Sequence, residues 1–588
     1  MISLFLKYIL TVNSNHRINR LSHLLNQVPI VFASFLSVVP RPQPTMEFTS
    51  LLRCSQLILA VLFLQNTHYF VLSFTKLSYS KSFKQAIAMS QTSSTSLDNL
   101  PAECDYLIVG GGATGMAFVD TLLKHSSSEQ KPSIVMVDQH ALPGGHWNDS
   151  YGYVRLHQPS SMYGVESTPL EPHPKDDEHR ATRLEIVQYY EGLLAKWQEA
   201  FPFVFVGNAR VDLAHFHQQP PNEQQVANLQ SVADASVTQS IRIRQRLVDA
   251  RYLEPDIPKF VPPQFTFDSS VVNVLTPNEL MEREESPSSP HHYCVIGAGK
   301  TGMDTVVYLL TVLKADPSQI TWIIPNEAWI TARENMKSCM EFLHTCCQLY
   351  QQGTSTDPRT TDFLQAGFRE WEKQGHIYRL AKDIEPTKFK DATLSKEEMA
   401  TLQRVTNILR NGRVAEITKE GAIIFADGTK HTVSSSAKDV TFVHCSAGAF
   451  QYTKQTQAPP PMFQKSVITI QDVYGTPGFC FVGSMIGFLE SLARLSDEER
   501  NQLCLKPTPD VSQLQKPLGP SGGDVGVLSP SHGLVQRVTN LKEWMAVPEI
   551  RAWITTNRLF NMNHKSPQEI DAMVDDIWKV LEKIQVVN

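Results

Sequence analysis

The chain lacks several features that would place it in a familiar class of protein. Its nine cysteines are scattered over 588 residues and form no C-x-x-C pair and no zinc-binding spacing. It contains no block of basic residues, and its net charge of −6 argues against a nucleic-acid partner. Its apolar runs are too short to span a bilayer. We therefore expect no bound metal, no nucleic-acid partner and no stable membrane span.

The first hundred residues are poor in acidic side chains. Before Asp98 there is one acid, Glu47, against eight Lys or Arg. This composition is typical of a targeting extension, and the apolar run Leu57–Leu64 after Arg53 resembles the core of a signal peptide. We predict that residues 1–100 direct the protein to an organelle or to the secretory pathway. A later translation start and a membrane anchor are the alternatives.

The strongest positive signal is a glycine-rich turn that occurs twice. Residues 105–116 and residues 293–304 each contain a short apolar run, then G-x-G-x-x-G, then a helix-like stretch. The first glycine of such a turn permits a sharp bend, the second lets the backbone approach a pyrophosphate, and the third lets the helix pack closely against the strand. Two such turns predict two bound dinucleotides, a flavin and a nicotinamide that exchange electrons. The glycines concerned are Gly110, Gly112 and Gly115 in the first turn and Gly297, Gly299 and Gly302 in the second.

The second turn also contains Gly-Lys-Thr, which suggests a nucleoside-triphosphate loop. That loop needs a glycine at the position of Cys294, so the spacing does not fit. Lys300 and Thr301 are instead predicted to lie in the first turn of the helix, beside a bound nucleotide.

An acidic residue marks the first unit. Asp138 ends the predicted strand 134–137, where a carboxylate hydrogen-bonds the ribose 2′-hydroxyl of a dinucleotide. In the second unit no acid ends the strand 320–324, and Arg333, a few residues later, could reach a 2′-phosphate. The choice between NADH and NADPH therefore stays open, and the second site could be degenerate.

Other patterns predict how the rest of the chain is arranged. We expect a helix over 183–200, a strand over 241–250, and a helical stretch over 334–412 that covers the active site and sets substrate specificity. A hairpin is expected over 412–430, with its tight turn at Asp427-Gly428. Residues 440–448 and 479–484 are predicted to be buried strands that return the chain to the first sheet.

These patterns predict an α/β fold. It has two Rossmann-like dinucleotide-binding domains, with the NAD(P) domain inserted in the FAD domain, and a helical C-terminal tail. The predicted boundaries are residues 101–260 and 436–500 for the FAD-binding domain, 261–435 for the NAD(P)-binding domain with its helical insert, 501–533 for a linker and 534–588 for the tail.

Several motifs resemble the flavin-dependent monooxygenase-like superfamily, which includes flavin-containing and Baeyer–Villiger monooxygenases and N-hydroxylases. Besides both glycine turns and Asp138, the similar elements are Gly144-Gly145-His146-Trp147, the Tyr/Gly/Arg run after it, and Phe481-Val482-Gly483. The resemblance covers roughly residues 104–500. It implies an FAD that is reduced by NAD(P)H, with dioxygen as a candidate co-substrate and a small organic molecule as substrate.

The resemblance also implies roles for individual residues. Trp147, Arg155, His157 and Gln158 are expected along the flavin, with Arg155 and His157 as the candidate catalytic residues. Core packing for Trp147, a surface ion pair for Arg155 and a structural role for His157 are the alternatives. The remaining candidate FAD contacts are Gly145, His146, Gly483 and Ser484.

One motif of these monooxygenases is missing. The fingerprint F-x-G-x-x-x-H-x-x-x-[WY] is expected just before the second glycine turn, but residues 265–274 contain neither its glycine nor its histidine. Two further functions therefore stay open. One is a flavin reductase or oxidase without oxygen transfer, and the other is a non-catalytic binding protein built on the same fold.

Overall fold

The computed structural model describes most of the chain after the N-terminal extension. The residues described are 95–127, 131–171, 179–221, 223–251, 256–283, 291–355, 361–433, 437–447, 460–474, 478–505 and 534–583. The predicted targeting segment and most of the predicted linker lie outside them. Within these ranges no helix is both long enough and apolar enough to cross a membrane.

The first sheet has seven strands, and its parallel part carries the first glycine turn. Strands β3, β2, β1 and β6 run parallel in that order, and β19 also pairs in parallel with β6. Strand β5 pairs antiparallel with β6, and β4 pairs antiparallel with β5 at the edge of the sheet. The strands are β1 (Glu103–Val109), β2 (Ile134–Val137), β3 (Phe203–Val206), β4 (Ala209–Val211), β5 (Gln225–Ser231), β6 (Thr238–Asp249) and β19 (Val467–Thr469).

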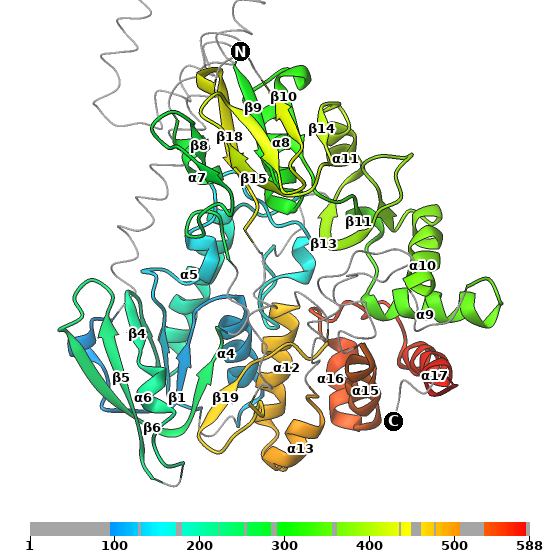
Figure 1. The fold of residues 1–588 in the computed structure, drawn as a ribbon. Helices are drawn as coiled ribbons and strands as arrows, with labels where there is room; N and C mark the ends of the chain where they lie inside the picture. Colours follow the sequence, from blue (N-terminus) through cyan, green and yellow to red (C-terminus); the bar gives the residue numbers. More distant parts are fainter. Residues whose placement is uncertain are drawn as a thin grey trace, which may run out of the picture. The chain divides into compact units, whose positions relative to one another are not determined.

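Helices cover the apolar faces of this sheet. All four residues of β2 are buried, as expected for a parallel strand that is covered on both faces. Helix α5 (Arg183–Ala200) spans the predicted range and begins with a capping box made by Thr182 and Glu185. Helix α4 (Ala113–His125) lies beside α12 (Phe479–Ser491) (Figure 1). The short helix α6 (Leu213–Phe216) follows β4.

The second sheet carries the second glycine turn and is entirely parallel. Its strand order is β14-β10-β9-β18-β8. The strands are β8 (Val274–Leu275), β9 (His292–Ile296), β10 (Ile320–Ile323), β14 (Ile408–Leu409) and β18 (Val440–His444). Helices α7 (Pro277–Glu282), α8 (Lys300–Thr311) and α11 (Lys396–Leu402) belong to the same region.

Two small sheets complete the strand content of the described residues. One joins β11 (Ala328–Ala332) to β12 (Ile377–Tyr378) and β13 (Lys388–Leu394). The other has the order β17-β16-β15-β7. It is formed by β7 (Thr266–Phe267), β15 (Val414–Ile417), β16 (Ala422–Phe425) and β17 (Lys430–Thr432). The predicted Asp427-Gly428 turn joins β16 to β17, where Phe425 N–H donates to Thr429 O.

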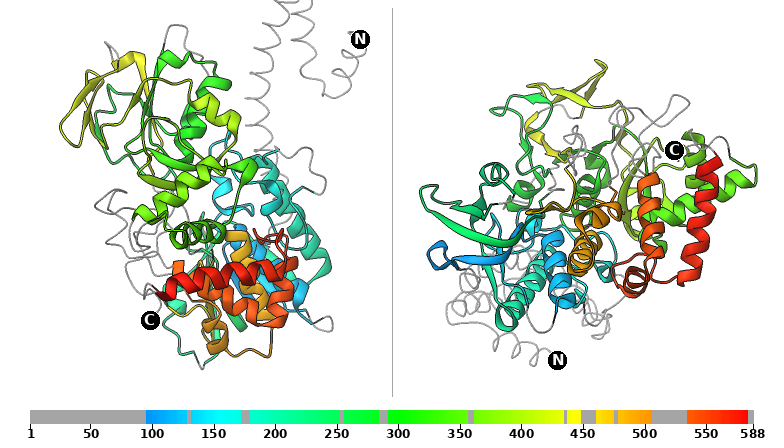
Figure 2. Two further views of the ribbon diagram at one scale, coloured as in Figure 1. Left: turned by 90° about the vertical axis from the view of Figure 1, so that its right-hand side faces the viewer. Right: turned by 90° about the horizontal axis from the view of Figure 1, so that it is seen from below.

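The remaining helices, apart from the short helix α13 (Asp497–Gln502), pack in one apolar core with α4, α5 and α12. Three of them form the predicted helical tail, and they lie beside one another at the orange-to-red end of the chain (Figure 2). The helices are α9 (Cys339–Gln351), α10 (Thr361–Lys373), α13 (Asp497–Gln502), α15 (Leu534–Ala546), α16 (Pro548–Thr556) and α17 (Pro567–Lys583). Cys346 and Cys347 are buried in α9.

The α/β class is confirmed, but three local predictions are wrong. Residues 479–484 begin helix α12, not a strand. Strand β18 pairs with β9 in the second sheet, so the chain rejoins the first sheet only at β19. The stretch 334–412 alternates helices with short strands. The division of the chain into domains stays a prediction.

Candidate functional site

The first glycine turn has the geometry that its spacing predicts. Gly110 has φ +108°, a value that side chains other than glycine's rarely tolerate. A Cβ on Gly115 would lie 2.0 Å from Gly110 O, so the third glycine is required for the helix to pack on the turn. Gly112 differs, because its φ is −80° and a Cβ there would come no closer than 3.6 Å to another atom. Nothing within the described residues therefore explains a glycine at Gly112.

The second glycine turn repeats this pattern. Gly297 has φ +135°, and a Cβ on Gly302 would lie 2.2 Å from Gly297 O. A Cβ on Gly299 would have no atom of the described chain beyond its immediate neighbours within 4 Å. The indole N–H of Trp322 donates to Gly297 O at 2.8 Å and fixes the turn. In both turns, then, the middle glycine borders space that the described chain leaves open.

Helices α4 and α8 begin at these turns with uncapped ends. Their N-cap residues are Gly112 and Gly299, and the described residues form no side-chain capping hydrogen bond at either position. Helices α5, α7, α9, α11 and α13 all begin with a capping box instead. Two helix N-termini with open N–H groups beside a glycine turn are suited to bind phosphates.

A cavity of about 520 Å³ opens at the carboxyl ends of β1 and β2. We call it the dinucleotide cavity. Its lining includes five residues that the sequence predicts as cofactor-binding: Gly110, Gly112, Asp138, Gly145 and His146. Burial and the nearby charge of His140 lower the pKa of His146 to about 4, so its ring is neutral near pH 7.

Asp138 lies at the centre of a polar chain beside this cavity. One carboxylate oxygen accepts from Gly111 N–H at 2.7 Å, and the other contacts His140 Nδ1 at 2.8 Å. The opposite nitrogen of His140 lies 2.6 Å from Asp149, whose other oxygen accepts from Lys259 at 2.7 Å. Burial alone would lower the pKa of His140, but the hydrogen bonds and charges of Asp138 and Asp149 outweigh it and raise the pKa to about 9.

This chain of polar groups predicts a pH-dependent stability. Because the pKa of His140 is raised from 6.5 to about 9, its charge stabilises the folded state fully below pH 6.5, and the stabilisation is lost as the pH rises through 9. After allowance for solvent screening, the effect is on the order of 2 kcal/mol. Thermal unfolding measured at about pH 6 and about pH 9.5 should show a fall in the midpoint that His140→Gln largely removes. An identical pH dependence in the variant would contradict the assignment.

The segment 144–158 connects the two glycine turns. Gly144 N–H donates to Gly111 O at 2.8 Å, so the Gly-Gly-His-Trp element packs directly on the first turn. Farther along, Tyr151 OH donates to Asp304 on α8 at 2.8 Å. Tyr153 stacks on Tyr308 of the same helix, with ring centroids 4.1 Å apart. One short segment thus fixes the first turn against the helix of the second.

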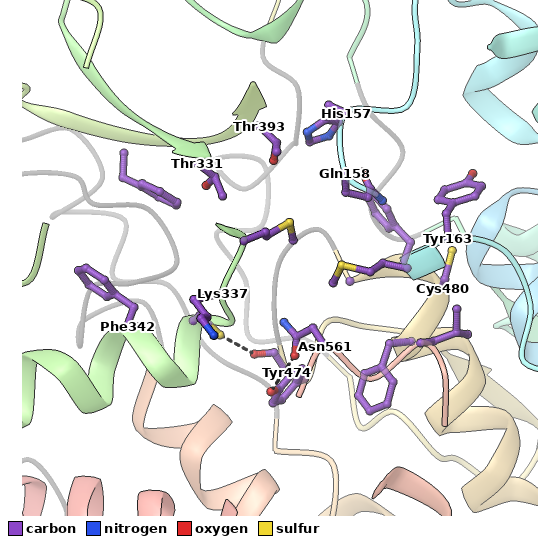
Figure 3. A pocket seen from close by; sticks show the side chains of 18 of the residues that line it. His157, Gln158, Tyr163, Thr331, Lys337, Phe342, Thr393, Tyr474, Cys480 and Asn561 are labelled. Atoms are coloured by element: carbon purple, nitrogen blue, oxygen red, sulfur yellow. Dashed lines mark hydrogen bonds between the residues drawn. The ribbon is translucent and has the colours of Figure 1, made fainter. Parts of the chain in front are cut away.

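A second cavity, of about 140 Å³, begins where this segment ends (Figure 3). We call it the inner cavity. His157, Gln158, Thr331 and Thr393 are among its lining residues. Phe479, at the start of α12, lines both cavities. The two cavities therefore share one lining residue.

Four predicted residues are held by protein partners. Trp147 is buried and donates its indole N–H to Tyr163 OH at 2.7 Å, which is the core-packing alternative. Arg155 donates to Arg180 O at 3.1 Å. Lys300 and Thr301 open α8 as predicted, and Lys300 is paired with Asp304. None of these four is among the residues that line the two cavities.

Arg333 is buried in an ion cluster. Its guanidinium donates to Glu398 at 2.7 Å and to His157 O at 2.8 Å. Burial alone would raise the pKa of Glu398, but the charges of Lys300, Arg180 and Arg333 outweigh it and lower the pKa to about 2. Arg333 thus anchors the backbone of His157, and protein oxygens accept hydrogen bonds from its Nε and Nη2 atoms.

Gly483 and Ser484 lie between helices. A Cβ on Gly483 would come within 2.3 Å of Thr114 O, so this glycine allows α12 to approach α4. Ser484 is fully buried, and its hydroxyl lies 2.6 Å from that of Thr121. Neither residue is among those that line the two cavities, and their predicted contact with a cofactor stays a prediction.

The sequence reasoning missed several residues of the site. His140 lies two positions after Asp138, and this Asp-x-His spacing is the sequence feature that could have identified it. Leu559 and Asn561 of the C-terminal region line the inner cavity, and no motif marks them. Within the described residues no group of His, Cys, Asp and Glu side chains is arranged to hold a metal ion.

Comparison with known proteins relates the chain to mycobacterial sequences. No family model matches the chain. It is 30% identical over 471 residues to Uncharacterized protein Rv2000 of Mycobacterium tuberculosis strain H37Rv, a match that covers 78% of this chain and 77% of that protein. Uncharacterized protein Mb2023 of Mycobacterium bovis matches with the same values.

Two solved structures show a weaker likeness. A flavin-containing monooxygenase from Stenotrophomonas maltophilia is 15% identical with a TM-score of 0.39, and the match covers 66% of this chain and 98% of that chain. A cyclohexanone-bound cyclohexanone monooxygenase is 14% identical with a TM-score of 0.39, and the match covers 70% and 90%.

Proposed function

The chain belongs to the family of the mycobacterial protein Rv2000, and we propose that it is an FAD-dependent oxidoreductase reduced by NAD(P)H. The observation that carries the proposal is the pair of middle glycines. Gly112 and Gly299 border open space at uncapped helix N-termini, although no packing within the described chain requires a glycine at either place. A pyrophosphate is the group that such a turn accommodates.

The residues of the dinucleotide cavity fit an FAD. The N-terminus of α4 would hold the pyrophosphate, and Asp138, with both oxygens already oriented by Gly111 and His140, would accept from the adenosine ribose. The exposed ring of Phe260 also lines the cavity and offers an apolar surface. When bound, FAD would supply the electron-transfer chemistry that no side chain provides.

The second turn fits a nicotinamide dinucleotide. The N-terminus of α8 would hold its pyrophosphate beside Gly299. The acid nearest the end of β10 is Glu327, which is buried and paired with Arg410. Because this carboxylate already forms an ion pair, it does not select for the ribose 2′-hydroxyl of NADH. Both NADH and NADPH are therefore candidates. The strands of the first sheet lie before and after this region in sequence, which supports an NAD(P) domain inserted in an FAD domain.

The chain's own residues would position the substrate and exclude water. The segment 144–158 ties the first turn to α8, and Arg333 holds the backbone of His157 beside the inner cavity. Seven of the residues that line this cavity are Phe, Tyr or Trp, and their rings would exclude water from the part of a substrate that contacts them. We propose a monooxygenase-like reaction on a small organic substrate with dioxygen, on the basis of the motifs similar to that superfamily.

An absorption spectrum tests the proposal. Protein purified after incubation with excess FAD should be yellow, and anaerobic addition of NADH or NADPH should bleach the flavin band. Colourless protein would contradict the proposal and favour a non-catalytic binding protein. On mixing reduced protein with dioxygen, product formation that matches NAD(P)H consumption would favour oxygen transfer. Stoichiometric release of hydrogen peroxide would favour an oxidase.

A further inference from the structure

The inner cavity is built from distant parts of the chain, one of which is the start of α12 with Phe479. His157 and Gln158 come from the segment after the first glycine turn, Phe342 and Trp371 come from α9 and α10, and Leu559 comes from the loop between α16 and α17. Figure 3 shows His157, Gln158 and Thr393 on one side of the cavity and Phe342 on another. The cavity therefore has a polar side, at His157, Gln158 and Thr393, and an apolar side, at Phe342.

The volume limits the size of a ligand. The cavity measures about 140 Å³. A buried apolar cavity of about 150 Å³ accommodates one benzene molecule. The inner cavity therefore matches a single six-membered ring with at most a small substituent.

The apolar side is made of aromatic rings that support one another. Phe342 lies edge-to-face against Trp371, with centroids 4.9 Å apart. Phe389 stacks on Phe368, which is fully buried behind the lining. The indole N–H of Trp371 is bonded to Thr345 at 3.1 Å, so the ring is fixed in place. A rigid aromatic wall favours a flat ring that stacks or packs edge-to-face against it.

The polar side is lined by His157, Gln158, Thr331 and Thr393, and among them His157 has a buried atom without a hydrogen-bond partner in the described part of the chain. Nδ1 of His157 is buried and has no hydrogen-bond partner among the described residues. Burial and the charges of Lys300 and Arg333 lower the pKa of His157 to about 3, so the ring is neutral near pH 7. An unpaired buried polar atom costs about 1–3 kcal/mol, and a ligand group that bonds to it would recover part of this cost.

The charges around the cavity disfavour a cationic ligand. Lys337 lines it, and its ammonium lies 3.7 Å from Glu341, which is outside the lining. The lining residues that the structure describes include no carboxylate. A buried organic cation would therefore meet a like charge and no partner of opposite sign.

We propose that the inner cavity binds a neutral single-ring aromatic molecule that carries one hydrogen-bonding substituent, with that substituent at His157 and the ring against Phe342 and Trp371. This assignment of the substrate class rests on the proposed function, because the inner cavity shares the lining residue Phe479 with the dinucleotide cavity.

The C-terminal tail sets one wall of this site. Arg558 donates to Ser161 O at 2.8 Å and to Tyr163 O at 2.9 Å, which fixes the loop after α16 against the segment that follows His157. Asn561 accepts from Tyr474 OH at 3.2 Å. Leu559, between them, faces the cavity and is a specificity-determining residue for ring size.

Calorimetric titration of the oxidised protein, without nicotinamide, tests the ligand class. Phenol should bind about tenfold more tightly than toluene, because one buried hydrogen bond of about 1.4 kcal/mol corresponds to a factor of ten in affinity. Benzylammonium should not bind, because its charge would meet no partner of opposite sign among the described lining residues. His157→Phe should reduce phenol affinity to that of toluene, whereas the same change at the exposed His215 should not alter it. Equal affinity for phenol and toluene, or binding of benzylammonium, overturns the proposal.

A second variant tests the tail. Leu559→Ala enlarges the cavity, so it should improve 2-naphthol binding relative to phenol by about tenfold or more. An unchanged ratio overturns the role of the tail. The flavin spectrum of each sample is read separately: a yellow protein that binds none of the probes refutes the substrate class but not the proposed function, and a colourless protein that binds phenol refutes the proposed function alone.

Discussion

Gly112→Ala is expected to give a folded protein that no longer retains FAD. The backbone at Gly112 has φ −80°, which alanine adopts freely, and the new methyl group would meet no atom closer than 3.6 Å. The methyl group would instead occupy the space that a pyrophosphate needs at the start of α4. We expect FAD affinity to fall about 100-fold or more, equivalent to about 3 kcal/mol, with an unchanged unfolding temperature of the flavin-free protein.

Gly115→Ala is the matched comparison in the same turn. Its methyl group would lie 2.0 Å from Gly110 O, so α4 has to shift away from β1. The flavin-free variant should therefore unfold at a clearly lower temperature, with a loss of several kcal/mol. Flavin fluorescence titration and thermal unfolding of both variants separate the two roles. Full FAD affinity in Gly112→Ala would show that this turn is not a phosphate cradle.

The glycine turns were predictable from the sequence because their constraints are local. A positive φ at Gly110 and Gly297, and a third glycine that contacts the first, follow from the spacing alone. Helix α5 was predictable for a similar reason, since Thr182 and Glu185 form a capping box within three residues. In these places sequence neighbours determine the structure.

The start of α12 was not predictable in this way. Residues 479–484 are almost uniformly apolar, and a short apolar run has no periodicity that separates a buried helix from a buried strand. Tertiary packing favours the helix at this place, because Gly483 and Gly487 let α12 approach the main chain of α4 near Thr114 and Phe118. That close approach depends on residues more than 300 positions away in sequence.

The site was predictable only in its nucleotide-binding half. Asp138 and the glycines lie in motifs, whereas the partners that define the roles of other residues come from distant segments. Arg333 stays a predicted contact for a 2′-phosphate, but only the structure shows that it is paired with Glu398. Leu559 entered no prediction, because only tertiary packing brings it to the inner cavity.

Gly299→Ala should separate the two cofactor sites. No atom of the described residues beyond its immediate neighbours lies within 4 Å of the position that the methyl group would occupy, so the variant should fold normally. The group would occupy the space proposed for the nicotinamide pyrophosphate at the start of α8. We expect FAD to be retained with unchanged affinity, and the apparent Kd for NADH and NADPH in anaerobic flavin reduction to rise about 100-fold.

Two further glycines serve as controls for this experiment. Gly302→Ala places a methyl group 2.2 Å from Gly297 O and should destabilise the protein as Gly115→Ala does. Gly192→Ala, on an exposed position of α5 where the methyl group likewise meets open space, should leave both cofactors bound and stabilise the helix by about 0.5–1 kcal/mol. If Gly299→Ala is reduced as fast as the parent protein at low coenzyme concentration, the second turn does not hold the electron donor. If it loses FAD instead, the two sites are coupled, either because both turns contact one nucleotide or because the change is transmitted through the segment 144–158, which contacts α8 at Asp304 and Tyr308.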